Sequence, residues 1–354
     1  MKERTRRINS LINLGEIETE PKGKPLCPCC RRGRVIRKEW IERDIWDMGK
    51  EPIRITQKRY LCQVCGKSFI HYPSGISRSS PYSLRLWNLA CLLWYLGLSV
   101  ENTAKVMRAI TGRNVSPAGV YKHLLSWGFE LSERLRRRKR DCPVVHIDQG
   151  YVRIKGKGWG FNIVVSPEGE VVDLQFLHNE EEETLENILK KVKKKTKAKL
   201  VVGDFHPSHN GAAEGSGMWF WGCWFHFMRL LFRRIRKTKD RFIRDILWAG
   251  TLPFPELEDE FYEAGIRSPP GEPKEVLFWV SDKFNELKTG EHFGFDPPFI
   301  TNNAAERAVL RTKTRYKLIR GFGSLKGAYS ALLLTQAFGE AFERGSVDMK
   351  TLFR

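Results

Sequence analysis

Two aspartates in this 354-residue chain each come directly after a short apolar segment. Asp148 follows Val144–Ile147, and Asp204 follows Leu200–Gly203. Continuous runs of this length predict buried strands, so each carboxylate is expected at the carboxyl end of a strand. If the two strands are neighbours, the carboxylates meet, and they repel one another unless a divalent cation lies between them. The alternative is that each aspartate only closes its own strand as a cap or turn residue.

A third carboxylate, Glu306, stands near the start of a predicted helix. Asn303, Glu306 and Lys313 fall on one face of that helix, because separations of three and seven residues are close to whole turns. This face can add a metal ligand and a cation to the site. Asn303 and Glu306 also have the spacing of a capping box, in which Glu306 only satisfies a backbone N–H. An N-cap from Thr301 or Asn302 would leave Glu306 free to bind metal.

Four cysteines form two C-x-x-C pairs, Cys27 with Cys30 and Cys62 with Cys65. This spacing lets two thiolates on one tight turn reach a single ion, and two such pairs predict a closed, tetrahedral, structural Zn²⁺ site. Cys29 could replace Cys27 or Cys30 as a ligand. The alternative is that these cysteines are reduced core residues. Strand-like alternation between the pairs makes residues 26–75 a predicted zinc ribbon.

The charge balance indicates a polyanionic partner. Lys and Arg number 61 against 41 Asp and Glu, which gives a formal net charge of +20. A surplus this large is typical of proteins that bind nucleic acid, although a basic thermophilic protein can also carry it. The chain has no run of about 18 apolar residues, and its basic N-terminus lacks the apolar core of a secretory signal. We therefore expect a cytoplasmic protein without a membrane partner, in which cysteines bind metal or pack rather than form disulfides.

The remaining N-terminal segments are predicted to serve DNA binding. Residues 1–25 are polar and basic, as in a flexible arm, and residues 131–141 form a basic linker. Between them, helical patterns at 80–130 predict a helix-turn-helix domain, or a generic three-helix bundle on the pattern alone. Ser116 and Pro117 start the third helix, and residues 117–127 are the expected recognition helix. Tyr121, Lys122 and His123 are predicted to face outward on it.

Residues 142–354 alternate between strand and helix patterns. Strands are predicted at 144–147, 159–165, 171–177 and 200–203, with a further candidate at 218–224, and helices at 180–195 and 226–235. Three antiparallel strands, a helix and then a parallel strand are the arrangement of an RNase H-like α/β domain, which would bring Asp148 and Asp204 side by side. Residues 240–298 predict a helical insertion with an aromatic core made of Trp248, Phe254, Phe261, Phe278 and Trp279.

Five short stretches together carry a family resemblance. They are His146–Asp148, Gly203–Asp204, Gly222–Arg229, Thr301–Ala308 and Gly321–Ala328. In this order the sequence, from the first cysteines to its end, resembles the DDE transposases of bacterial and archaeal insertion sequences, most of all the group numbered sixty-six. The resemblance implies that Asp148, Asp204 and Glu306 are a catalytic triad that binds two Mg²⁺ (or Mn²⁺) ions. It also implies that Lys313 grips DNA beside them.

Cys223 and His226 match a C-x-x-H motif that several such families carry between the second and third carboxylates. The pair is half of a zinc site, or it packs around the fifth strand. No second pair of ligands lies near it in the sequence, which favours packing.

The implied function is that of a DNA transposase, which binds transposon ends and then cleaves and joins DNA strands at the triad. Its partners would be double-stranded DNA and further copies of the chain, in a homodimer or a larger synaptic complex. One alternative is a transposase-derived, sequence-specific DNA-binding regulator without catalysis; another is an RNase H-like nuclease without strand transfer. The residues expected to contact DNA are basic or aromatic: Tyr121, Lys122, Arg136, Arg137, Arg307, Arg311, Lys313 and Arg315.

Overall fold

The computed structural model describes most of the chain, which divides into two compact units. The described residues are 12–78, 80–139, 141–177, 182–237, 241, 244–245, 257–267, 270–295, 300–319, 321–343 and 347–348. Unit 1 comprises Met1–Ser132 with Lys326–Arg354, and unit 2 comprises Glu133–Leu325. None of the helices within the described ranges has both the length and the apolar character needed to cross a membrane.

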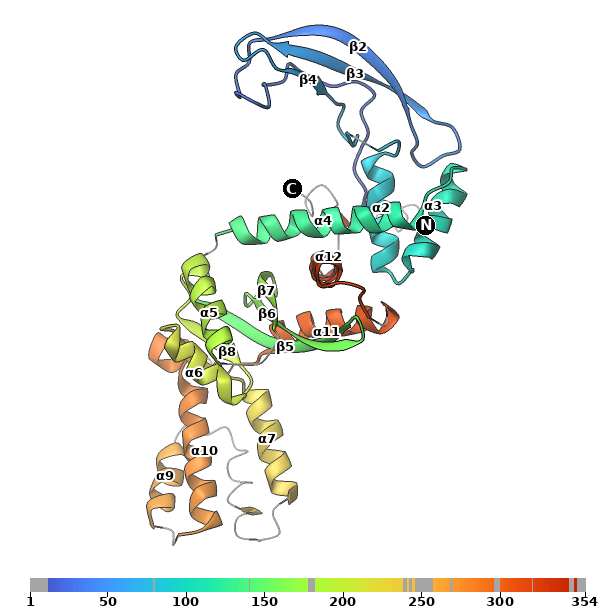
Figure 1. The fold of residues 1–354 in the computed structure, drawn as a ribbon. Coiled ribbons are helices and arrows are strands. Elements are labelled where there is room, and N and C mark those ends of the chain that lie inside the picture. Colours follow the sequence, from blue (N-terminus) through green and yellow to red (C-terminus); the bar gives the residue numbers. More distant parts are fainter. Residues whose placement is uncertain are drawn as a thin grey trace, which may run out of the picture. The chain divides into compact units, whose positions relative to one another are not determined.

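Unit 1 contains a three-stranded antiparallel sheet. Its strands are β2 (Val35–Ile45), β3 (Ile53–Cys62) and β4 (Ser68–His71), in the order β2-β3-β4 (Figure 1). The strand-like alternation predicted between the cysteine pairs is therefore confirmed, as β2 and β3. A two-residue parallel pairing joins β1 (Ile12–Asn13) to β10 (Val347–Asp348).

Three helices follow: α2 (Leu84–Tyr95), α3 (Val100–Thr111) and α4 (Pro117–Arg137). Serine caps fix where they start. The side chains of Ser83 and Ser99 accept hydrogen bonds from the first turns of α2 and α3, and Ser116 Oγ accepts one from the Gly119 N–H at 3.1 Å. The predicted start of the third helix at Ser116-Pro117 is confirmed, since a capping hydroxyl before a proline at the first position favours it.

Helix α4 is longer than predicted, and one residue predicted to face outward on it packs inward. It continues to Arg137, through most of the segment predicted as a linker, because good helix formers such as Leu131 and Leu135 prolong the pattern. His123 does not face outward. Its ring stacks on Trp87 with centroids 4.6 Å apart, and burial lowers its pKa to about 4.

Helix α12 (Leu325–Glu343) crosses α4 closely at Gly128. A Cβ added at Gly128 would overlap the Cα and Cβ of Ser330. We expect Gly128→Ala to lower the free energy of unfolding by about 2 kcal/mol, because the two backbones must move apart and the gain in helix propensity offsets only part of that cost. Urea denaturation would measure the change.

The matched control for this prediction is Gly119→Ala in the first turn of the same helix. There the nearest atom to an added Cβ is Ser116 Oγ at 3.2 Å, and the hydroxyl can rotate slightly. The control should be neutral or slightly stabilising. Equal stabilities for the two variants would contradict the close crossing.

Unit 2 is built on a mixed five-stranded sheet in the order β7-β6-β5-β8-β9 (Figure 1). Strands β5 (Val144–Ile154), β6 (Lys157–Val165) and β7 (Val171–Leu177) are antiparallel, and β8 (Leu200–Gly203) and β9 (Trp219–Gly222) run parallel to β5. The predicted strands, including the candidate fifth, are present. Their apolar runs are buried, as central strands of a covered sheet require.

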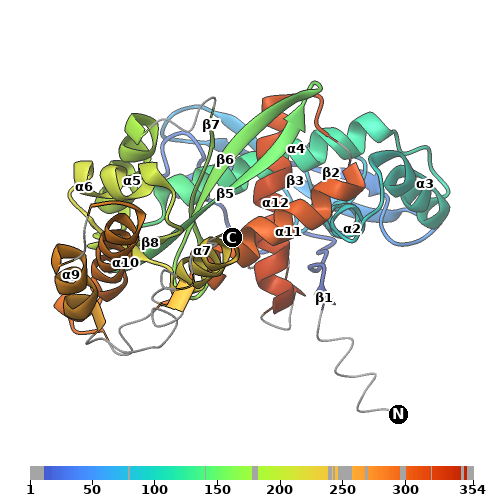
Figure 2. The same cartoon turned by 90° about the horizontal axis from the view of Figure 1, so that it is seen from below.

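Helices cover this sheet and extend from it. α5 (Glu182–Thr196) and α6 (Pro207–Gly215) pack with β5 and β8 in one apolar core, and α11 (Asn303–Ile319) lies against β5 and β6. α7 (Trp224–Lys237), α9 (Leu257–Arg267) and α10 (Glu272–Lys288) form a second core; Figure 2 shows α9 and α10 side by side. The unit is thus a mixed α/β structure.

The predicted helical insertion corresponds to α9 and α10 where it is described. Phe261 is buried in their core and Trp279 packs against it, whereas Phe278 contacts Tyr262. Trp248 and Phe254 lie outside the described residues.

Candidate active site

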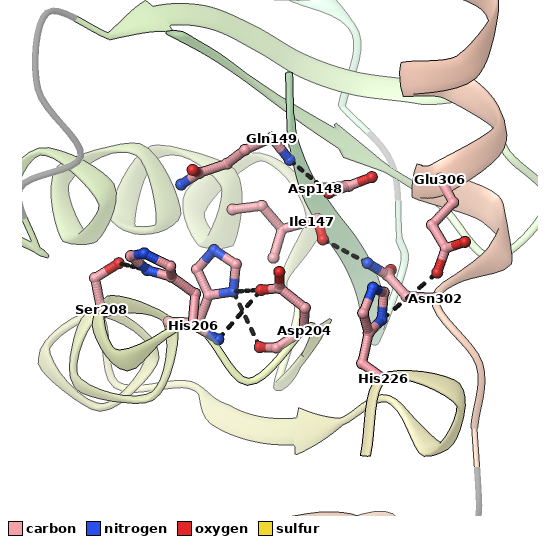
Figure 3. Close-up of polar contacts among 10 residues, drawn as sticks. Ile147, Asp148, Gln149, Asp204, His206, Ser208, His226, Asn302 and Glu306 are labelled. Carbon is pink, nitrogen blue, oxygen red and sulfur yellow. Dashed lines mark hydrogen bonds and ion pairs between the residues drawn. The ribbon is translucent and has the colours of Figure 1, made fainter. Parts of the chain in front are cut away.

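Asp148 and Asp204 lie level with one another on two neighbouring parallel strands. Asp204 directly follows β8, as expected, but Asp148 lies within β5, which continues to Ile154, so the prediction that Asp148 stands at the end of its strand is wrong. His146 of β5 is in register with Val202 of β8, so two residues further on Asp148 comes level with Asp204, just past the end of β8. Figure 3 shows Asp148 on β5, with Asp204 and Glu306 on neighbouring segments around it. The two aspartates come from positions far apart in the sequence, and the sheet topology alone makes them neighbours.

The electrostatics of Asp148 show that the carboxylates act on one another. Burial raises the pKa of Asp148 to about 6, and the negative charges of Asp204 and Glu306 add to the shift. The backbone N–H of Gln149, which donates to Asp148 Oδ1 at 2.7 Å, and the charge of Lys313 act in the opposite direction. The arrangement therefore concentrates negative charge that a cation would neutralise.

Asp204 is held by a buried histidine. Its own burial favours the protonated form, but His209, together with the charge of His226 and the backbone N–H of His206, outweighs this effect, and the pKa of Asp204 is lowered. His209 Nδ1 lies 2.7 Å from Asp204 Oδ1 and 3.2 Å from the Asp204 backbone oxygen, and the His209 side chain is 2% exposed. The ring is therefore placed to donate to the carboxylate and to keep it charged and in one orientation.

Replacing His209 tests this positioning role. We expect His209→Gln to weaken Mn²⁺ binding at the carboxylates about 10- to 100-fold, which is typical for the loss of a partner that orients a metal ligand. Titration calorimetry with Mn²⁺ measures the affinity. The control is His206→Gln, because the His206 ring bonds Ser208 Oγ at 2.8 Å and not a carboxylate. Equal affinities in both variants would show that His209 does not position Asp204.

Glu306 is in the first turn of α11, and Asn302 determines how that helix meets the sheet. The helix begins at Asn303, and the Glu306 N–H donates to the Asn302 carbonyl at 3.0 Å, so Asn302 precedes the helix as its cap. The fully buried Asn302 side chain donates from Nδ2 to the Ile147 carbonyl at 2.7 Å, one residue before Asp148. This bond fixes Glu306 next to β5.

The Glu306 side chain points to His226 rather than back to the helix start. Glu306 Oε1 lies 3.5 Å from His226 Nδ1 (Figure 3). The capping-box interpretation with Asn303 is therefore wrong, because Asn303 is already inside the helix. The sequence leaves Thr301 or Asn302 as the N-cap residue that would keep Glu306 free. In the structure the N-cap position is Asn302.

Two groups of candidate ligands are tight enough to hold one ion within the described ranges. In each, the ligand atoms all lie within 4.8 Å of one another: Cys27, Cys30, Cys62 and Cys65 form the first, and Cys223, His226 and Glu306 the second. Asp148 and Asp204 belong to neither. The three residues of the predicted triad thus lie near one another. Glu306 also belongs to a second, tighter group with Cys223 and His226.

The four-cysteine group can hold a metal such as zinc. The Sγ atoms of Cys27 and Cys65 are 3.6 Å apart, and those of Cys30 and Cys62 are 3.5 Å apart. In a tetrahedral site with Zn–S bonds of about 2.3 Å, sulfurs are separated by about 3.8 Å, so this spacing fits one ion. The backbone N–H of Cys65 points at Cys62 Sγ and lowers the pKa of Cys62 to about 6, which favours the thiolate. Cys29, the spare, is exposed.

The predicted DNA-contacting residues differ in their exposure. Tyr121, Lys122, Arg136, Arg137, Arg307 and Lys313 are exposed and Arg311 is half-buried, with Arg136 and Arg137 both paired to Glu133. Arg315 is an exception, since it is only 5% exposed and burial lowers its pKa to about 10. Arg315 is therefore a buried side chain, which is not the position expected of a residue that contacts DNA.

Comparisons with known proteins do not identify a function for this chain. No known protein family and no curated protein matches the chain. One similar structure is a chain of the simian T-cell lymphotropic virus intasome, solved in complex with the PP2A regulatory subunit B56 gamma, at 10% sequence identity and a TM-score of 0.21. The match covers 43% of this chain and 51% of that one. A TM-score this low does not indicate a shared fold.

Sequence reasoning missed three roles in this site. His209 pairs with Asp204, Asn302 joins α11 to β5, and His226 faces Glu306. A signal existed for two of them: His209 follows Asp204 by five residues across a turn with Pro207, and His226 belongs to the C-x-x-H spacing. Nothing in the sequence indicates that the Asn302 side chain reaches Ile147, 155 residues away.

Proposed function

We propose that the chain is a DDE transposase whose unit 2 is an RNase H-like catalytic domain. One observation carries the proposal: Asp148, within β5, comes level with Asp204, just past the end of the adjacent parallel strand β8, with Glu306 close enough for its charge to raise the pKa of Asp148. Three neighbouring carboxylates are costly to the folded state unless a cation binds them. A function that needs a bound cation explains why the chain keeps three carboxylates at this place despite their destabilising effect.

Asp148, Asp204 and Glu306 are the residues that would hold Mg²⁺ or Mn²⁺. The donor set fits, because hard divalent cations prefer carboxylate oxygens, and the pKa of Asp148 is raised by burial first and by the charges of Asp204 and Glu306 in addition. When bound, a pair of such ions supplies charge stabilisation to a phosphodiester and activates water or a DNA 3′-hydroxyl as the nucleophile.

The chain's own residues prepare this site for a nucleic acid. His209 keeps Asp204 ionised and oriented, and Asn302 fixes the start of α11. Lys313 is exposed, and its charge reaches Asp148, so it offers a phosphate contact beside the carboxylates. Arg307 is exposed on the same helix. These cations would hold a DNA backbone at the point where the carboxylates act.

Unit 1 supplies the proposed recognition of transposon ends. The zinc ribbon at residues 26–75 and a helix-turn-helix at residues 80–130 would read the DNA, with Tyr121 and Lys122 exposed on α4 for contacts. The arm at residues 1–25 and the basic segment at 131–141, including Arg136 and Arg137, would add phosphate contacts. Since two ends must be cut and joined together, the active form would be a homodimer or a larger synaptic complex on double-stranded DNA.

An end-cleavage assay tests the proposal. Purified full-length protein is incubated with a duplex carrying the inverted repeat that flanks its reading frame, with Mg²⁺ or Mn²⁺, and the strands are separated on a denaturing gel. The proposal expects nicked ends and then products joined to target DNA. Nicking without joining would instead support an RNase H-like nuclease, and binding without nicking would support a DNA-binding regulator.

A further inference from the structure

A second group of candidate metal ligands lies beside the carboxylates, where β9, α7 and α11 begin or end. β9 ends at Gly222, Cys223 follows, and His226 stands in the first turn of α7. Two backbone contacts bring α11 to this point: Cys223 forms a parallel bridge with Ile300, and the Trp224 N–H donates to the Ile300 carbonyl at 2.9 Å. Glu306 is thereby placed against the C-x-x-H pair, although it is 80 residues away from His226 in the sequence.

The spacing of the donors is that of ligands around one ion. Cys223 Sγ and the facing atoms of His226 and Glu306 lie within 4.8 Å of one another, and His226 Nδ1 and Glu306 Oε1 are 3.5 Å apart. Tetrahedral Zn²⁺ with bonds to nitrogen and oxygen of about 2.0–2.2 Å separates two such ligands by about 3.4 Å. The observed distance is longer than a normal charge-assisted hydrogen bond, which has about 2.8 Å between its heavy atoms.

Two of these donor atoms are buried without a hydrogen bond. His226 Nδ1 and Glu306 Oε1 have no hydrogen-bond partner in the described part of the chain, and each faces the other across the gap. A buried polar atom left in this way is expensive, typically about 1–3 kcal/mol, unless something satisfies it. A cation between them would satisfy both at once.

Cys223 is surrounded by backbone donors that would stabilise a metal-bound thiolate. Burial raises the pKa of its thiol, and the backbone N–H groups of His226 and Asn302 act in the opposite direction, so a bound cation is what would favour the thiolate here. Cys223 is fully buried, and the Asn302 N–H donates to its Sγ at 3.1 Å. Backbone N–H groups pointing at sulfur also occur in the four-cysteine group of unit 1, at Cys62. This kind of contact disperses the negative charge of a metal-bound thiolate.

From this geometry we propose that Cys223, His226 and Glu306 form a Zn²⁺ site, distinct from the four-cysteine site. A thiolate, an imidazole and a carboxylate form a donor set that selects zinc over Mg²⁺, since thiolate and imidazole bind borderline-soft ions. Three protein ligands leave the fourth tetrahedral position open to an exogenous oxygen ligand, such as water or a phosphate oxygen. Glu306 Oε1 binds this zinc ion, and the second carboxylate oxygen of Glu306 is left for the Mg²⁺ or Mn²⁺ ions proposed at Asp148 and Asp204. The C-x-x-H pair therefore binds metal rather than only packing around β9.

Zinc content per chain tests the site. Full-length protein is loaded with Zn²⁺, dialysed against metal-free buffer and analysed by mass spectrometry of the metal. The wild-type chain is expected to retain two zinc ions, one in each cysteine-containing group, and Cys223→Ser and His226→Gln to retain one. Because His226 is less buried than Cys223, His226→Gln keeps the test valid if Cys223→Ser fails to fold.

The matched control is Cys142→Ser. Cys142 is also a buried cysteine of unit 2, but its Sγ donates to the Val144 carbonyl at 2.8 Å, a bond that a serine hydroxyl can retain. This variant should keep two zinc ions. A second readout is Co²⁺ substitution, in which the wild-type spectrum should lose part of its thiolate charge-transfer absorption in Cys223→Ser and none in Cys142→Ser.

Three results would overturn the proposal: a single zinc in the wild-type chain, two in Cys223→Ser or His226→Gln, or displacement of the second zinc by millimolar Mg²⁺. The inference does not rest on the proposed transposase function, although both use Glu306. A chain that retains one zinc and still nicks DNA would refute only the zinc site. A chain that retains two and never nicks would refute only the transposase.

Discussion

Asp148→Asn is expected to lower the rate of end cleavage about a thousandfold or more, while binding of the end DNA changes little. The substitution preserves the shape of the side chain. It removes the negative charge that would bind the cation acting on the phosphodiester. DNA affinity would persist because it comes from exposed cations such as Lys313 and Lys122. Cleavage is followed on gels with labelled ends, and binding by fluorescence anisotropy.

The same substitution should stabilise the protein in the absence of Mg²⁺ and Mn²⁺. The pKa of Asp148 is raised from 3.8 to about 6 in the folded state. Well below pH 4 both the folded and the unfolded state carry the proton, so the carboxyl costs nothing. Between about pH 4 and pH 6 the unfolded state has released the proton while the folded state still holds it, so the free energy of unfolding falls with rising pH, by about 2–3 kcal/mol in total, and levels off above pH 6. Asp148→Asn avoids that loss.

Urea denaturation at pH 8 and pH 5 separates this effect from a general change in packing. The variant should be more stable than the wild type at pH 8 and gain only about half as much at pH 5. Added Mg²⁺ should stabilise the wild type and not the variant. If the two proteins unfold at the same urea concentration at pH 8, the buried charge of Asp148 does not destabilise the folded state as predicted.

Asp173→Asn is the matched control for the cleavage measurement. Asp173 is another half-buried carboxylate of unit 2, on β7, and burial also raises its pKa, but its side chain accepts a hydrogen bond from Gln175 at 2.7 Å and takes no part in the site. Its replacement should leave cleavage within about twofold of wild type. A comparable loss of cleavage in Asp173→Asn would show that the effect of Asp148→Asn comes from lost folding.

The sheet of unit 2 could be predicted because its strands are short apolar runs ended by polar residues. The runs that precede Asp148 and Asp204 have no alternation, which is typical of strands covered on both faces, and the order of strands and helices then leaves few topologies. The cysteine ribbon was predictable for a different reason, since C-x-x-C spacing is a local geometric requirement of the metal. In both cases a short stretch of sequence carries the physical constraint.

The contacts that tune the site could not be predicted in this way. The burial of Arg315 and the contact between Glu306 and His226 depend on how α11 packs against β5, which no local pattern encodes. The same holds for His123, which stacks on Trp87 of another helix. A helical pattern indicates which residues share a face, but the partner of that face comes from tertiary packing. Charged and aromatic residues, which suit both surface and interior, are therefore the ones misplaced.

Cys62→Ser is expected to unfold the ribbon while leaving unit 2 folded. The ribbon has one buried cluster, Ile45, Ile55 and Ile76, at the end of β2 and β3 away from the cysteines. The apolar core around the cysteines is small: Cys27, Val35, Tyr60 and Cys62 are its buried members, with Cys30 and Phe69 packed beside them. Three of these six are metal-ligand candidates, so the metal must contribute much of the folding free energy, as in other small zinc domains, where binding supplies about 10–16 kcal/mol. A hydroxyl in place of the Cys62 thiolate removes a ligand that the Cys65 N–H already favours as an anion.

Hydrogen exchange resolves this outcome strand by strand. In Cys62→Ser the amides of β2, β3 and β4 should exchange within the dead time, whereas those of β5 and β8 stay protected, because the core of unit 2 contains none of these cysteines. Cys29→Ser is the control: Cys29 is exposed and outside the four-cysteine group, so the variant should keep both its zinc and its protection. Protected ribbon amides in Cys62→Ser would mean that β2–β4 fold without the metal. Loss of zinc in Cys29→Ser would mean that Cys29, rather than Cys27 or Cys30, completes the site.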